Sequence, residues 1–211
     1  MDFGLAFTNP FKDPDWLKKI AIISLVGLIP IVGQFVVLGW ALEIARRVIG
    51  GDSQPLPELN FGEQLVKGFQ SWLIALVYAL PMILAIIPLA IVDTLAANAG
   101  GEAQNLLAGV TLCASALFFL YGLFVGFILP AAYGRFADKG SLGAAFHLGE
   151  VLGLVRNNPA AYLIVLLGYL VAGFIAPAGF ILCFIGVILT GTYAQAIIFH
   201  LVGQAYRQSL R

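Results

Sequence analysis

The longest uncharged stretch of this sequence decides its class of fold. From Asn157 to Tyr206 the chain runs for fifty residues without an Asp, Glu, Lys or Arg. A helix crosses the hydrocarbon core of a bilayer with about 20 apolar residues, so this stretch suits two crossings rather than one. Pro177 and Gly179 lie where the two crossings would meet, and both residue types are typical of a helix break. The sequence therefore predicts an all-α, polytopic helical membrane protein.

The overall composition agrees with that class. Of the residues, 61% are hydrophobic and 10% are charged, whereas soluble domains carry about 25% charged residues. Basic and acidic side chains number 11 each, and no basic cluster is interleaved with aromatic residues, which argues against a nucleic-acid partner. Cys113 and Cys183 each lie inside an apolar run, so we expect both to be buried free thiols. The sequence begins Met1-Asp2-Phe3-Gly4, without the basic start of a signal peptide, so we expect the first apolar run to stay in the membrane rather than to be cleaved.

Five apolar segments are long enough, or nearly long enough, to cross the membrane: 20–42, 71–92, 106–134, 160–176 and 178–203. We treat residues 1–211 as a single integral membrane domain, with a weak internal duplication between 16–92 and 106–203. Segments 43–70 and 135–157 are each predicted to contain an amphipathic helix lying in the membrane interface. The apolar faces of these two helices would consist of Phe61, Leu65, Val66, Phe69 and Trp72 in the first, and of Leu148, Leu152 and Val155 in the second.

The first apolar segment, 20–42, has two possible topologies. Basic residues favour the cytoplasmic side, and four later crossings would place the C-terminus there. A single proline-kinked crossing of 20–42 would put Lys12, Lys18 and Lys19 outside. A re-entrant hairpin that turns at Pro30 and Gly33 would instead keep all 11 basic residues on the cytoplasmic side. Length favours the crossing and charge favours the hairpin; we favour the hairpin, with a cytoplasmic N-terminus.

The residues before this segment predict the start of a helix. Asp13 is placed to act as its N-cap, and Pro14 suits the first helical position. We expect Trp16, with Lys18 and Lys19, to anchor this helix at the membrane interface.

Two stretches resemble a known family. They are AFTNPFKDPDWLKKI, from Ala6 to Ile20, and LPEL, from Leu56 to Leu59, which is followed by Gly68-Phe69 and by YALP, from Tyr78 to Pro81. Together they resemble signature blocks of a prokaryotic integral membrane family known only as a domain of unknown function, DUF4013. The resemblance covers the first 90 residues well and the rest only by layout. It implies a multi-pass protein of a bacterial or archaeal inner (cytoplasmic) membrane, and it implies no activity.

Side chains that catalyse reactions or bind metals are sparse. Metal or haem ligation needs two or more converging ligands, and the only histidines are His147 and His200. His200 is the one candidate cofactor ligand, although a hydrogen-bonded histidine explains it more simply. The sequence lacks the nucleophile, zinc-protease and phosphate-loop motifs, and Asp93 is the only aspartate near a span. We therefore predict no catalytic residue, no metal site and no cofactor apart from bound lipid.

Small residues recur at four-residue spacing along two of the spans. They are Gly122, Gly126, Pro130 and Gly134 in the third long segment, and Gly186, Thr190 and Ala194 in the last. Such stripes let membrane helices approach closely. The spans also contain amides and hydroxyls, among them Gln34 and Gln195. These side chains can line a path for an uncharged solute, and they can equally join helices.

These patterns favour a non-enzymatic membrane protein that works by helix association, as a subunit or an assembly or scaffold factor of a larger membrane complex. Its partners would be membrane lipids and either other membrane subunits or a second copy of the chain. The alternative is a small transporter or channel for an uncharged or lipid-like solute, with Gln34 and Gln195 along the path. A third hypothesis is an interfacial lipid-modifying enzyme that uses His147 and Glu150.

Overall fold

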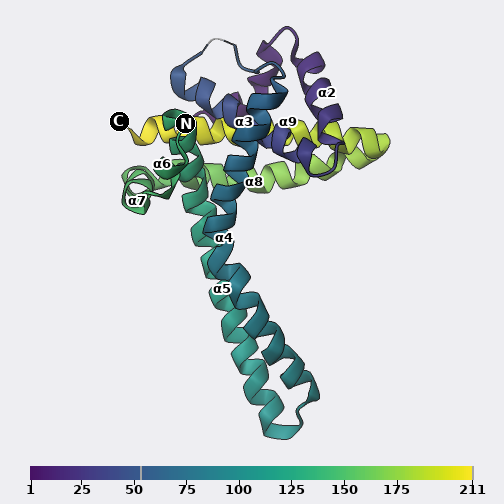
Figure 1. Ribbon diagram of the computed structural model, residues 1–211, viewed down its shortest axis with the longest axis vertical. Coiled ribbons are helices and arrows are strands. Elements are labelled where there is room, and N and C mark those ends of the chain that lie inside the picture. Colours follow the sequence, from purple (N-terminus) through teal and green to yellow (C-terminus); the bar gives the residue numbers. More distant parts are fainter. Residues whose placement is uncertain (53, 211) are drawn as a thin grey trace. The chain divides into compact units, whose positions relative to one another are not determined.

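The computed structural model describes residues 1–52 and 54–210, except for the side chains of residues 181–185, so the thiol predicted at Cys183 lies outside the described residues. Within these limits the chain contains helices and no strand (Figure 1). The elements are α1 (Phe3–Thr8), η1 (Pro10–Lys12), α2 (Trp16–Gly27), α3 (Val32–Gly50), α4 (Phe61–Asn98), α5 (Gly101–Lys139), α6 (Leu142–Phe146), α7 (Leu148–Asn157), α8 (Pro159–Ala178), η2 (Gly179–Leu182) and α9 (Cys183–Ser209).

The chain divides into two units, each described here by itself. The core unit consists of Met1–Ile74 and Phe127–Arg211. The hairpin unit is Ala75–Gly126, which holds the later part of α4 and the earlier part of α5.

Four helices are long and apolar enough to cross a membrane, which confirms the predicted class of fold. They are α4, α5, α8 and the part of α9 from Gly186 to Ser209. With 38 and 39 residues, α4 and α5 are each about 57 Å long, well beyond the ~30 Å hydrocarbon core. Both helices therefore extend past the predicted spans, 71–92 and 106–134. Ala99 and Gly100 alone connect the two helices, whereas the predicted spans leave residues 93–105 between them.

The first apolar segment folds as two helices rather than as one kinked helix. α2 ends at Gly27 and α3 begins at Val32, and the two helices pack against each other. The turn between them closes with a 2.7 Å hydrogen bond from the Val32 amide to the Pro30 carbonyl. Ile31, in the middle, has φ 64° and ψ −62°, the rare and strained form of the γ-turn. Gly33 follows because a Cβ at that position would overlap the Val26 carbonyl.

Helices α8 and α9 form the centre of the core unit, and α3 packs against α9 (Figure 1). Close contacts between small groups hold these helices together. A Cβ on Gly179 would overlap the backbone of Gly186, and a Cβ on Gly203 would lie 2.7 Å from the Ala45 carbonyl. Buried side chains of every size fill the remaining space: Trp40, Tyr162, Ile197, Phe199 and Leu201 are all nearly inaccessible to solvent. Close backbone contacts between helices therefore contribute to the core as much as the packing of large apolar side chains does.

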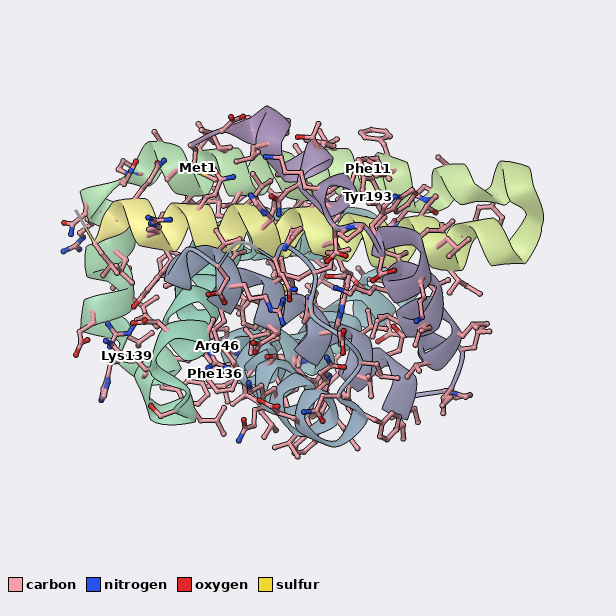
Figure 2. The ribbon with its side chains drawn as sticks, turned by 90° about the horizontal axis from the view of Figure 1, so that it is seen from above. Met1, Phe11, Arg46, Phe136, Lys139 and Tyr193 are labelled. Atoms are coloured by element: carbon pink, nitrogen blue, oxygen red, sulfur yellow. The ribbon has the colours of Figure 1, made fainter. Side chains whose placement is uncertain are left out.

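The N-terminal segment lies along α9. The Tyr193 hydroxyl donates a 2.8 Å hydrogen bond to the Phe7 carbonyl, and the Tyr193 ring lies 5.6 Å from that of Phe11 (Figure 2). Closer to the C-terminus, Gln204 accepts from the Asp2 amide and donates to the Asp2 carbonyl. The segment that contains α1 and η1 is thus held against α9 near both of its ends.

Segment 43–70 does not form the separate interfacial helix that the sequence predicts, because α4 runs from Phe61 without a break. The apolar side chains Phe69 and Trp72 are exposed, and the neighbouring face, with Gln64, Gly68 and Ser71, is buried. Small groups on that face allow the backbones of α3 and α4 to touch, since a Cβ on Gly68 would overlap the Phe35 carbonyl.

Segment 135–157 contains the end of α5 and the two short helices α6 and α7. In α7 the buried residues are Val151 and Leu154, whereas the predicted apolar residue Leu148 is exposed. α7 is thus held mainly through a face next to the one expected, on which Leu152 and Val155 are half-buried.

The α3–α4 crossing yields a stability prediction. We expect Gly68→Ala to lower the free energy of unfolding by about 1–3 kcal/mol, because the added methyl forces two helix backbones apart. Gly62→Ala, on the same helix but with open space around it, is the matched control and should shift the free energy by less than about 1 kcal/mol. Unfolding in mixed detergent micelles measures both values. Equal stability of the two variants would contradict the close crossing.

Candidate functional site

The loop after α3 is held by side chains from two helices. Leu56 is buried, and its carbonyl accepts hydrogen bonds from Lys19 Nζ at 3.1 Å and from Arg47 Nη1 at 3.2 Å. The neighbouring Pro57 carbonyl accepts from the indole N–H of buried Trp40 at 2.9 Å. α2 supplies the lysine and α3 supplies the arginine and the tryptophan. We call this set of contacts the Leu56 clamp.

Lys19 is oriented in the clamp by Asp13. Their ion pair measures 2.7 Å, and the two side chains are only 12% and 3% exposed. Burial by itself raises the pKa of the Asp13 carboxyl, but the hydrogen bond and charge of Lys19 and the Asp15 amide together hold that pKa below its usual value. Two predictions are corrected here: α2 begins at Trp16 rather than at Pro14, and Lys19 is an internal partner instead of an interfacial anchor.

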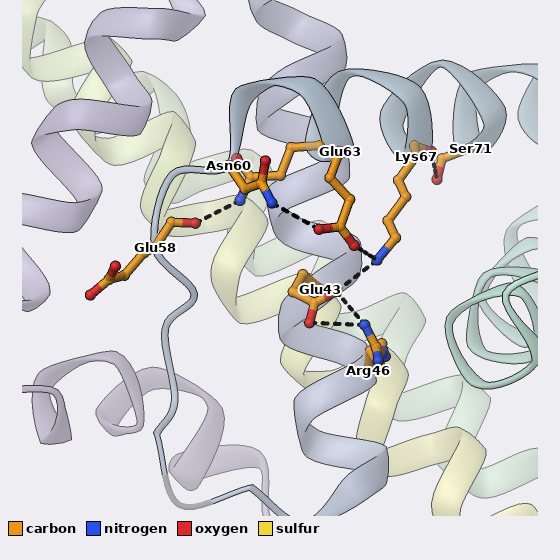
Figure 3. Close-up of polar contacts among 8 residues, drawn as sticks. Glu43, Arg46, Glu58, Asn60, Glu63, Lys67 and Ser71 are labelled. Carbon is orange, nitrogen blue, oxygen red and sulfur yellow. Dashed lines mark hydrogen bonds and ion pairs between the residues drawn. The ribbon is translucent and has the colours of Figure 1, made fainter.

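A second polar network joins α3 to the start of α4 (Figure 3). Lys67 lies between two carboxylates, 3.1 Å from Glu43 and 2.6 Å from Glu63. Glu43 also pairs with Arg46 at 3.3 Å, and Glu63 accepts from the Asn60 amide at 2.9 Å. Each charge in this network has an opposite partner, so it is suited to joining two helices rather than to proton transfer.

The described residues contain no metal-binding cluster of three or more His, Cys, Asp or Glu side chains. His200, the candidate cofactor ligand, lies on α9 and is 4% exposed. Neither of its ring nitrogens has a hydrogen-bond partner among the described residues. His147, the other histidine, is exposed at the junction of α6 and α7. The two histidines therefore differ strongly in their surroundings.

The residues of the first predicted small-residue stripe lie in different environments along α5. Gly134 lies against Tyr206 of α9, where a Cβ would come within 2.7 Å of the tyrosine side chain. Pro130 is buried and Gly126 is half-buried. Gly122 is exposed, and a Cβ on it would have no neighbour within 4 Å.

The second stripe, on α9, lies against α8 and its turn. The Thr190 hydroxyl donates to the Ala176 carbonyl at 2.7 Å. Gly186 meets Gly179 of η2, and Ala194 is buried. Pro177, predicted as a helix break, occupies the last turn of α8, and the chain reverses just after it.

The two glutamines proposed for a solute path have separate surroundings. Gln34 is exposed and its side-chain amide donates to the Gly27 carbonyl at 2.9 Å, so it caps the end of α2. Gln195 is half-buried on α9 between the buried residues Ala194 and Ala196.

Two further expectations about reactive side chains change. Glu150, proposed for lipid chemistry, forms an ion pair with Arg135, which also donates to the Ala144 carbonyl at 3.0 Å. This pairing makes Glu150 a link between α5 and α7. Cys113 is exposed rather than buried, because it lies on a face of α5 that the chain leaves uncovered.

Sequence reasoning missed the long-range polar pairs. The Tyr206 hydroxyl donates to Asp138 at 3.0 Å and joins the ends of α9 and α5. The Ser24 hydroxyl donates to Thr192 at 2.8 Å and joins α2 to α9. Neither pair has a local signal, since the partners lie far apart in the sequence; buried hydroxyls inside apolar helices are the only hint.

Comparison with known proteins identifies a family without a function. The family model described as "Protein of unknown function (DUF4013)" matches residues 22–191, most of the chain. The chain therefore belongs to that family. No curated protein and no solved structure matches it.

The Asp13–Lys19 pair gives a pH-dependent stability prediction. Asp13→Asn leaves Lys19 buried without its counter-charge, and we expect the free energy of unfolding to fall by about 3–5 kcal/mol near neutral pH. Because the folded-state pKa of Asp13 is lowered, its contribution is complete above the unfolded value of 3.8 and is lost as the pH falls through the folded value. The difference between the two proteins should therefore shrink below that pH.

The matched control for this measurement is Asp15→Asn, which removes an exposed carboxylate. A deficit of the Asp13 variant that stays constant down to the lowest pH would contradict the role of the charged pair.

Proposed function

We propose that this member of the DUF4013 family works without catalysis, by helix association, as a subunit or assembly factor of a larger membrane complex. The observation that supports the proposal most is an alternation of small and large residues along one face of α5 in the hairpin unit. Small residues recur there every seven positions, at Ala108, Ser115 and Gly122, and all three are exposed. Leu112 and Phe119 alternate with them and are 73% and 67% exposed. We call this face the α5 seam.

The spacing of the seam is that of helices which pack knobs into holes. Alternating steps of four and three residues keep one stripe in line with a partner helix. Large side chains at two positions supply the knobs, and small residues at three positions supply the space for a partner's knobs. In lipid, where apolar burial gives no driving force between helices, such close packing is what favours association. A seam of this kind suits a second membrane helix better than it suits lipid tails alone.

The polar contacts described within the hairpin unit lie away from the seam. The Tyr121 hydroxyl donates to the Tyr78 carbonyl, and the Thr111 hydroxyl donates to Asp93, both at 2.7 Å. These contacts join α4 to α5. They leave the α5 seam available to a partner.

The membrane topology in this proposal places both ends of the chain on the cytoplasmic side of a prokaryotic inner membrane. α2 has 12 residues and is about 18 Å long, too short to span a ~30 Å hydrocarbon core. The turn after it exposes Leu28, Ile29 and Ile31. Apolar residues at the tip of a short helical pair support a hairpin that enters the membrane and returns. α7, with Leu148 facing outward, would lie in the interface on the same side.

Crosslinking tests the α5 seam. With Cys183→Ala throughout and Cys113→Ala in addition, Ser115→Cys should give one discrete crosslinked species in native membranes with a short bifunctional maleimide. The natural Cys113 lies about 200° around the helix from position 115, on the opposite face, and should give none.

Two glycine variants provide the matched controls. Gly122→Leu fills the seam and should abolish the Ser115→Cys product, whereas Gly109→Leu, on another open face of α5, should leave it unchanged. Equal crosslinking from positions 113 and 115, or none from either, would contradict association through this seam.

Thiol labelling tests the topology. In a chain without its natural cysteines, Lys12→Cys should be protected from a membrane-impermeant maleimide in spheroplasts, as Arg156→Cys should be. Gly100→Cys, between α4 and α5, should react. If Lys12→Cys reacts as readily as Gly100→Cys, segment 20–42 crosses the membrane once and the re-entrant hairpin is wrong.

A second candidate function, transport of an uncharged or lipid-like solute, is favoured by a cavity in the hairpin unit. It has a volume of about 390 Å³ and lies between α4 and α5 beside Pro81 and Pro88. Its lining is apolar except at Tyr121, whose hydroxyl already donates to Tyr78. Flux of an apolar fluorescent solute into liposomes tests this alternative. Ala114→Trp, which fills the cavity, should reduce that flux, and flux equal to that of empty liposomes would exclude the transporter.

A further inference from the structure

A second cavity, in the core unit, has a different chemical character. It has a volume of about 410 Å³ and lies between α1, α3, α9 and the loop after α3. Most of the side chains that line it are polar or charged. They include Arg47, Asp52, His200, Gln204, Arg207 and Gln208.

His200 is the most deeply buried polar residue of the cavity lining. Its side chain lines the cavity, is 4% exposed, and has no hydrogen-bond partner for either ring nitrogen among the described residues. Buried polar groups in folded proteins are nearly always hydrogen-bonded, so an unpartnered imidazole has a partner still to be assigned. The Arg47 and Gln204 side chains also line the cavity but already donate to backbone carbonyls, at Leu56 and Asp2 respectively.

The charges around the cavity favour an anion. Arg47 and Arg207 both line it, and neither forms an ion pair with a carboxylate in the described part of the chain. Asp52 is the single acidic residue of the lining, and it is exposed. The carboxyl ends of α3 and α9 help to stabilise the two guanidinium groups, but each helix end carries only about half an elementary charge. Arginine presents donors in a planar fork that matches the oxygens of phosphate.

The position of the cavity along α9 identifies the ligand further. His200, Gln204, Arg207 and Gln208 share one face of this helix, at spacings of four, seven and eight residues. Arg207 is in the last turn of a membrane-crossing helix, where the phosphates of lipid headgroups lie. His200 is two turns, about 10 Å, deeper. The site therefore extends inward from headgroup depth.

We infer that this cavity binds a phosphate group, with Arg207 and Arg47 holding its oxygens and the His200 ring beside its deeper end. The same chemistry is offered by the headgroup of an anionic phospholipid and by a free phosphate. Gly51 lies at the rim with φ 78°, a conformation that other residues rarely adopt, and Arg207 Nη1 lies 3.7 Å from where its Cβ would be. The inference uses residues of the core unit only, so it does not depend on the α5 seam.

Binding to the full-length protein in a maltoside detergent, which contains no phosphate, tests the inference. Native mass spectrometry would count bound phosphatidylglycerol, with the matching diacylglycerol as the phosphate-free comparison, and inorganic phosphate would be added in a separate titration. We expect phosphatidylglycerol to bind at least tenfold more tightly than diacylglycerol. Arg207→Gln should lower that affinity about tenfold, and Arg156→Gln, outside the cavity, should leave it unchanged.

Nitrogen NMR of the His200 ring provides a readout that does not depend on lipid counting. Its signals should shift when the ligand is added to the wild type, and they should shift much less in Arg207→Gln. Displacement of phosphatidylglycerol by inorganic phosphate would assign the site to a free phosphate. No displacement would assign the site to the lipid headgroup. Both results support a phosphate site. Equal affinity for the two lipids together with an unmoved His200 signal would overturn the inference and leave the cavity to water.

Discussion

Two adjacent backbone carbonyls, those of Leu56 and Pro57, are the point on which the core unit depends. Lys19 and Arg47 donate to the first and Trp40 donates to the second, so α2 and α3 are both fixed to the loop that precedes α4. The donors are charged or buried, and their hydrogen bonds are stronger and less replaceable than those of exposed groups. Because the clamp fixes that loop, it also determines where α4 starts and how its glycine-rich first turns meet α3. The same clamp takes up part of the donor capacity of Arg47, which leaves the remainder for the neighbouring cavity.

The two units differ in which side chains they bury and which they expose. The core unit buries small, polar and large apolar groups between its helices, and Phe69 and Trp72 are among the aromatic side chains that it leaves exposed. The hairpin unit has two helices and little interior, and most of its large apolar side chains are exposed. Its regular alternation of small and large residues on α5 is the feature that distinguishes a surface for a partner helix from one for lipid alone. In the proposed function, the first unit supplies stability and the second supplies association.

Helix positions could be predicted from the sequence because lipid imposes one strong requirement, a long uncharged helix. The break at Pro30 and Gly33 and the reversal near Gly179 could also be predicted, because proline and glycine interrupt the uncharged runs there. The polar pairs could not be predicted: Asp13 looks like a helix cap until the fold brings Lys19 and Leu56 to it. The orientation of Gln64 and Ser71 was also hidden, because periodicity locates an apolar face without saying whether lipid or protein covers it. His200 was visible as a residue, but its lack of a partner is a property of the fold.

The central claim is that the protein acts as part of an assembly in the membrane. The mass of the particle that carries it, measured in discs cut directly from native membranes by an amphipathic polymer, tests that claim most directly because no detergent separates the partners. We expect most of the protein in particles that contain more than one polypeptide chain, with a constant composition as expression is lowered. Particles that each contain a single copy of this chain and no other protein, at every expression level, would contradict it.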